Sequence, residues 1–169
     1  MKINLTLSKS SIDAAIRELD KYQKKIKEKS AELVRKLAEA GIAVAKGRRG
    51  RWGELIQFYP SATTFSADGT TAEIDLIGTA EPIGDIKPLA FAEFGSGWLA
   101  NVLWDVEGVG QGTFPNQTHA FDPKGWYYRD EDGELHHTFG ELPTYPMYFA
   151  SLEIMQKVDE IGREVFGRL

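Results

Sequence analysis

The sequence predicts an α+β fold in a single domain that covers residues 1–169. The expected parts are a long N-terminal helix, an antiparallel β-sheet with a long glycine-rich loop, and a C-terminal helix packed on the sheet. Three observations lead to this class. Apolar residues recur at helical spacing in the first 46 residues, they do so again after residue 146, and the segments between are short, strand-like and bounded by turn residues.

The first helix is expected to continue to about Lys46. Ser10, with Asp13 three positions later, resembles a capping box at its start. Residues 21–29 are nearly all polar, so that stretch should be exposed. Such a helix spans about 50 Å, more than a domain of this size covers, so it either projects or breaks near Gly41. Its apolar positions are Ile12, Ile16, Leu19, Tyr22, Ile26, Leu33, Leu37, Ala40 and Val44.

Strands are expected in the middle of the chain. Leu55–Tyr59 forms one strand, and a turn at Ser66–Gly69 leads to a second at Ala72–Ile77, where apolar and acidic residues alternate. Leu89–Phe94 is the most apolar segment, which predicts a central strand.

A long glycine-rich loop is expected over residues 95–125, and loops of this length are usually functional or become ordered on assembly. An aromatic hairpin should follow, with strands at Trp126–Arg129 and Glu134–Thr138 joined through Asp132-Gly133. The last helix begins with Pro146 in its first turn. Its buried stripe is expected at Phe149, Leu152, Met155 and Val158, together with Ile154, Ile161 and Val165.

Composition narrows the function classes. The chain has no cysteine, which excludes disulfides and thiolate metal sites and fits a reducing compartment. No run approaches the roughly 18 apolar residues of a membrane span. Charge is divided unevenly, because residues 1–49 hold thirteen Lys/Arg against six Asp/Glu, whereas the remainder holds seven against nineteen. A solvated lysine-rich face is the simple interpretation, and a basic-on-acidic contact between neighbouring copies is the more specific one.

No constellation in the sequence predicts catalysis, a cofactor or a metal. His119, His136 and His137 have no ligand spacing, and adjacent residues of a strand point to opposite faces. The acids at residues 130–134 lack the calcium-loop pattern, so a hairpin turn is preferred. Residues 108–113 lack the lysine and the following helix of a phosphate loop. Glu93 has no partner acid or nucleophile, and we expect it to bind backbone N–H groups near Gly95–Gly97.

Arg48, Arg49 and Arg51 beside Trp52 combine cations with an aromatic ring, as a non-specific DNA contact would. The alternative is a flexible basic loop without a ligand. Some apolar residues that fall in or beside the long loop are too apolar for permanent exposure, and we expect them on the parent core or at a subunit interface. These candidates are Trp98, Leu99, Val102, Leu103, Trp104, Phe114 and Trp126.

The ordered set of motifs resembles the tail-component family of long-tailed double-stranded DNA phages and prophages, the tail-completion or head–tail joining (neck) proteins. The resemblance covers essentially the whole chain. Tyr145 departs from it, because the family more often has a residue such as methionine there. The matching segments are LTLSKSSIDAAIREL at residues 5–19, FAEFGSG at Phe91–Gly97, Gly110–Thr138, PTYPMYFA at Pro143–Ala150 and REVF at Arg163–Phe166.

The resemblance implies a non-enzymatic virion protein, assembled in the host cytoplasm, that forms a ring, sixfold in expectation, at the head–tail junction. Its partners would be copies of itself, the tail terminator or tail tube, the head connector and, without sequence preference, packaged DNA. No small-molecule substrate or membrane is implied. Two alternatives stay open, a tail terminator that caps the tail tube, and a nucleic-acid-binding accessory protein that uses the lysines at residues 24–29 and the Arg48–Arg51 loop.

Overall fold

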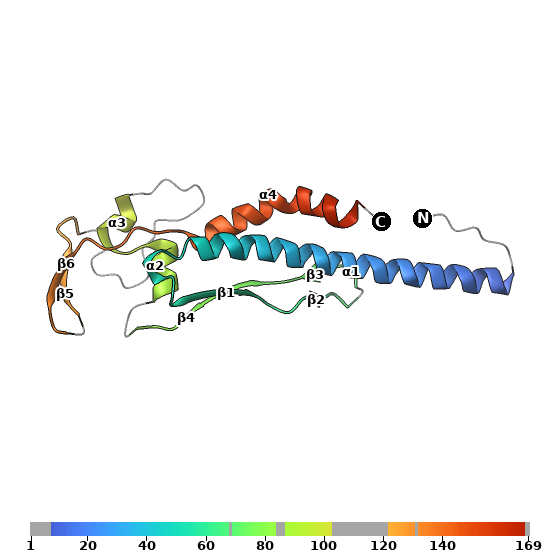
Figure 1. The fold of residues 1–169 in the computed structure, drawn as a ribbon, viewed down its shortest axis with the longest axis horizontal. Coiled ribbons are helices and arrows are strands. Elements are labelled where there is room, and N and C mark those ends of the chain that lie inside the picture. Colours follow the sequence, from blue (N-terminus) through green and yellow to red (C-terminus); the bar gives the residue numbers. More distant parts are fainter. Residues whose placement is uncertain (1–7, 68, 84–86, 103–121, 131, 168–169) are drawn as a thin grey trace.

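The computed structural model describes residues 8–67, 69–83, 87–102, 122–130 and 132–167. The described part is elongated (Figure 1). A long helix runs through most of its length, a second helix lies along part of the first, and a small hairpin occupies the end opposite the helix N-terminus. The α+β class is confirmed.

Helix α1 (Lys9–Gly47) has 39 residues and spans about 58 Å at the usual rise per residue. Ser8, not Ser10, caps it, since the Ser8 hydroxyl oxygen accepts a hydrogen bond from the Ser11 N–H. The helix does not break at Gly41. Instead, a side chain there would meet Ile154 Cδ1 at 2.7 Å and Leu76 Cδ1 at 2.9 Å, so the glycine permits close packing.

Helix α4 (Pro146–Phe166) runs antiparallel to α1 and lies mainly along it, while strands β1 (Ile56–Pro60) and β4 (Leu76–Ala80) lie along another side of α1 (Figure 1). The expectation of a C-terminal helix packed on the sheet is therefore corrected in its detail, because α1 provides most of the surface that α4 covers. None of the helices in the described ranges is long and apolar enough to cross a membrane.

The strands form three antiparallel pairs instead of one sheet. β1 pairs with β4, β2 (Thr64–Phe65) with β3 (Ala72–Glu73), and β5 (Trp126–Arg129) with β6 (Leu135–Thr138). The strand expected over residues 72–77 is divided between β3 and β4. The predicted aromatic hairpin is confirmed.

The prediction of a central strand at Leu89–Phe94 is wrong. This segment belongs to helix α2 (Pro88–Phe94), with Pro88 in the first turn and Gly95 at the C-terminal end at φ 69°. A short apolar run cannot be assigned to helix or strand by periodicity alone. The start of the expected loop is also helical, as α3 (Gly97–Val102).

The core lies where α1, the 3-10 turn η1 (Gly50–Trp52), β1, α2 and α4 meet. The expected stripe of α4 is only partly buried: Met155 is 71% exposed and Val158 also faces solvent. Ile161 and Val165 of that stripe are buried, together with Pro146 and Ala150. The buried core cluster consists of Ile42, Ala45, Trp52, Ile56, Phe58, Ala92 and Ala150.

Candidate functional site

Glu93, in α2, lies at the N-terminal end of α4. One carboxylate oxygen accepts a hydrogen bond from the Met147 N–H at 2.7 Å, and the other accepts one from the Tyr148 N–H at 2.9 Å. A helix leaves these first-turn N–H groups without intrahelical partners, and its dipole favours negative charge there. Glu93 therefore caps α4 from another helix, and the prediction that it binds near Gly95–Gly97 is wrong.

Burial raises the pKa of Glu93, and the two backbone hydrogen bonds oppose this effect. Burial also raises the pKa of the neighbouring Tyr145, with a further contribution from the charge of Glu93. Tyr145 is buried and has a left-handed backbone at φ 50°, directly before α4. The Ala92 carbonyl fixes this turn, because it accepts hydrogen bonds from the N–H groups of Thr144 and Tyr145.

The FGSG motif that follows Glu93 is held by the segment that leads to α4. Ser96 and Glu141 exchange two backbone hydrogen bonds, each of 2.9 Å. Gly95, at φ 69°, lies so close to this segment that a side chain there would meet the Glu141 carbonyl oxygen at 2.5 Å, and a side chain at Gly140 would collide with the Ser96 carbonyl. The motif is thus explained by close backbone approach.

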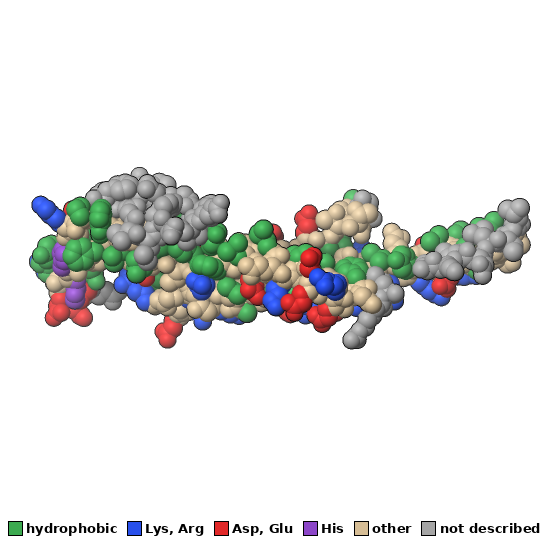
Figure 2. Space-filling model, turned by 90° about the horizontal axis from the view of Figure 1, so that it is seen from above, with side chains coloured by type: hydrophobic (Ala, Val, Ile, Leu, Met, Phe, Trp, Pro, Cys, Tyr) green, Lys and Arg blue, Asp and Glu red, His purple; other side chains and the backbone are tan. Residues whose placement is uncertain are grey.

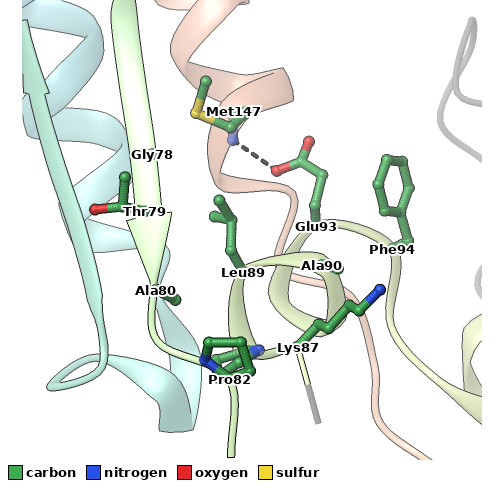
Figure 3. A pocket seen from close by; sticks show the side chains of 11 residues that line it. Gly78, Thr79, Ala80, Pro82, Lys87, Leu89, Ala90, Glu93, Phe94 and Met147 are labelled. Carbon is green, nitrogen blue, oxygen red and sulfur yellow. Dashed lines mark hydrogen bonds between the residues drawn. The ribbon is translucent and has the colours of Figure 1, made fainter. Parts of the chain in front are cut away.

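An open cavity of about 720 Å³ lies between β4, α2 and the start of α4 (Figure 3). Its walls are mainly apolar and come from residues 78–80, Pro82, Leu89, Phe94 and Met147. Glu93 is the one carboxylate among the described residues that line it, and both of its oxygens already accept backbone hydrogen bonds. This arrangement is typical of a structural cap, and the expectation that the protein is not an enzyme stays a prediction.

The three arginines proposed to contact DNA are engaged within the protein. The Arg48 guanidinium lies 3.5 Å from the centre of the Phe149 ring and donates to the Thr144 carbonyl. Arg49 donates to the carbonyls of Lys46 and Ile56, which joins the end of α1 to β1.

Arg51 lies over the Trp52 ring and pairs with Glu141 at 3.0 Å. Burial raises the pKa of Glu141, and the charge of Arg51 opposes that shift. These contacts support a structural role for all three arginines, although Arg48 and Arg51 remain exposed, so a DNA contact stays a prediction.

The β5–β6 hairpin presents two different faces. On one face Trp126 packs on the FGSG segment, where a side chain at Gly97 would collide with the indole ring. The other face carries an aromatic group in which the His137 ring lies 4.6 Å from the Tyr127 ring and 4.8 Å from the Phe139 ring. Tyr127 is 67% exposed. This exposed group, which sequence reasoning did not single out, is readable from the alternation of residues 135, 137 and 139.

The turn of this hairpin brings Asp130, Glu134 and His136 together, with potential ligand atoms within 4.8 Å of one another. Asp130 is already committed to the turn. One of its oxygens accepts the N–H groups of Asp132 and Glu134, and the other lies 2.6 Å from His136 Nε2. The hydrogen bond from His136 lowers the pKa of Asp130. The geometry agrees with the interpretation as a hairpin turn.

The predicted interface residues are only partly described. Trp98 and Leu99 lie in α3 and are half-buried, as is Trp126. Val102 ends α3, but its side chain lies outside the described part, and Leu103, Trp104, Phe114, His119 and residues 108–113 lie outside the described residues altogether. Comparison of the chain with protein-family models, with curated proteins and with solved structures finds no match.

Proposed function

We propose that this chain is a structural virion protein of a tailed phage or prophage, which forms a ring of identical copies at the head–tail junction. The proposal starts from the ordered set of sequence motifs that resembles the tail-completion and neck proteins. Its role would be to join the completed tail to the DNA-filled head.

The observation that carries the proposal is the amount of surface that a single copy leaves uncovered. The chain has an accessible surface of 11636 Å² for 18.9 kDa, whereas a compact monomer of this mass exposes about 8,300 Å². Large apolar residues contribute to this surface along α1 and on the β5–β6 hairpin. Such a shape suits a subunit that buries surface against neighbours better than a protein that acts alone.

The test is to delete the gene from the phage or prophage that carries it and to image the particles by electron microscopy. Normal tails beside unattached, filled heads are expected for a joining protein. Abnormally long tails would identify a tail terminator instead. Normal infectious particles, or purified virions without this protein, would contradict the proposal.

A further inference from the structure

Nine of the fifteen exposed large apolar side chains of the described residues lie on or next to the elements at the two opposite ends of the molecule, whose places Figure 1 shows. Figure 2 shows hydrophobic side chains along the projecting part of α1 at the right, and hydrophobic, histidine and acidic side chains together over the hairpin at the left. One group is Ile12, Ile16, Leu19 and Tyr22, and the other is Tyr127, Tyr128, Leu135, Phe139 and Leu142.

The first group lies on the arm, by which we mean residues 9–22 of α1. Near the C-terminal end of α4, Glu164 pairs with Lys36 of α1 at 2.6 Å. The β2–β3 hairpin contacts α1 near Lys27, whose ammonium lies 4.5 Å from the Phe65 ring centre. The arm lies N-terminal to both contacts, although Asp20 lines a hollow with Ala67 and Gly69 of the β2–β3 turn and Ala15 is buried. Its large apolar residues are exposed and keep the helical spacing of a face that packs on a partner.

The second group includes the outer hairpin face, by which we mean Tyr127, Leu135, His137 and Phe139. Its rings are held in place, because His137 Nε2 lies 2.8 Å from the Lys124 carbonyl oxygen and its ring is packed between those of Tyr127 and Phe139. An isolated two-stranded hairpin is only marginally stable in water and gains from being covered. Fixed, exposed aromatic groups are typical of the residues that dominate binding energy at interfaces.

The hairpin end is acidic, and a basic stretch of α1 follows the arm. The arm holds three Lys/Arg and three Asp/Glu, residues 23–29 hold four lysines against one glutamate, and residues 122–142 hold two Lys/Arg against six Asp/Glu. A hairpin-to-hairpin contact would bring acidic groups together, whereas an arm-to-hairpin contact can bring the lysines next to the arm close to the acidic turn. Because the two surfaces differ, their contact is heterologous, the type that can close into a ring.

We propose that the outer hairpin face binds the arm of a second copy of this chain. The inference rests on the proposed function in taking the protein as a ring subunit, and it names the surfaces through which neighbouring copies meet. The apolar stripe of the arm would cover the rings of Tyr127 and Phe139, and the acidic turn beside them would attract the lysines at residues 24–29, next to the arm.

Disulfide crosslinking tests this pairing directly, since the natural chain has no cysteine. Full-length Leu19→Cys and Tyr127→Cys proteins are mixed and oxidised, and both sites are exposed enough to leave folding unchanged. We expect the mixed dimer to form several-fold faster than either homodimer. The matched control replaces Tyr127→Cys by Asp159→Cys, an exposed position on α4, and should crosslink to Leu19→Cys at the slow background rate.

A charge exchange provides the second test. Arg17→Glu with Lys25→Glu leaves the apolar stripe intact, so a several-fold loss of crosslinking would report charge alone. Asp132→Lys with Glu134→Lys in the other partner should restore it. Crosslinking no faster than in the control, faster arm-to-arm dimers, or a wild-type protein that stays monomeric at its highest soluble concentration would each overturn the pairing. If the pairing fails but the protein is found at the junction of purified particles, the proposed function stands and only these surfaces are wrong.

Discussion

At the scale of single residues, Glu93 connects two segments that are distant in sequence. Its carboxylate holds the first turn of α4, and the backbone next to it, at Ala92, holds the turn at Thr144–Tyr145. A buried helix end without such partners is destabilising, because each N–H group has lost its hydrogen bonds to water and has no other acceptor. This residue thus stabilises the start of the C-terminal helix.

We expect Glu93→Ala to lower the free energy of unfolding by about 1–3 kcal/mol, because two N–H groups of α4 lose their acceptor. Chemical denaturation monitored by circular dichroism measures this change. Glu160→Gln, on the exposed side of α4, is the matched control and should have little effect, since surface ion pairs such as that with Lys157 contribute little. Equal stability of Glu93→Ala and wild type would contradict the assigned cap.

The raised pKa of Glu93 also predicts a pH dependence. The protonated Glu93 carboxyl holds its proton more tightly in the folded protein than in the unfolded chain. Proton binding therefore stabilises the fold fully below the ordinary pKa of 4.5, and this contribution is lost as pH rises through the raised pKa. Glu93→Gln removes this titration. The free energy of unfolding of wild type relative to Glu93→Gln should therefore decline as pH rises from 4.5, and a constant difference would contradict the assignment.

At the scale of elements, the packing of α1 on α4 and β4 depends on a glycine in the middle of a helix. Gly41 allows Ile154 and Leu76 to approach the α1 backbone from two elements. Glycine is otherwise unfavourable in helices because of its backbone entropy. At position 41 the loss of helix propensity is offset by the close contact with Ile154 and Leu76.

Two glycine substitutions should have opposite effects on stability. Gly41→Leu places a large side chain where the nearest atoms of Ile154 and Leu76 leave no room, and we expect it to destabilise the protein by about 1–3 kcal/mol. Gly162→Ala, within α4, meets nothing within 4 Å and should stabilise by about 0.5–1 kcal/mol through helix propensity. Thermal unfolding followed by calorimetry compares the two variants, and a shift of the same sign in both would contradict this account of the packing.

At the scale of the whole molecule, the elongated shape separates a folded body from an exposed arm. The body contains the core cluster, which no residue of the arm joins. The body should therefore account for the free energy of unfolding, and the arm should account for self-association. The same division places the apolar stripe of the arm and the aromatic, acidic hairpin at opposite ends of the molecule (Figure 1).

Deletion of residues 1–22 should leave the thermal midpoint nearly unchanged and abolish self-association. Analytical ultracentrifugation and calorimetry of the full-length and shortened proteins check both parts. Full-length Leu19→Asp is the control that keeps the chain length and breaks only the apolar stripe of the arm, and it should behave like the deletion. A shortened protein that still associates would place the contact elsewhere.

Strong local signals allowed several parts of this fold to be predicted from sequence. The helical spacing of α1, the Asp-Gly turn of the β5–β6 hairpin and Pro146 at the start of α4 each act through nearby residues, and each prediction is confirmed. The sequence allowed α1 either to project or to break near Gly41, and the structure has a continuous helix through Gly41. The resemblance to phage neck proteins stays a prediction.

The remaining features of the fold depend on contacts between residues that are far apart in the sequence, and local spacing does not reveal such contacts. Packing at Ala92 settled helix against strand at Leu89–Phe94, although Pro88 and Gly95 at its ends are local helix signals. Glu93 found its partners 54 and 55 residues away, and the arginines at residues 48–51 found theirs on segments that only the tertiary structure brings near, such as Thr144 and Glu141. Local patterns thus determined most of the elements, and burial shared between distant segments determined the others and how the elements pack together.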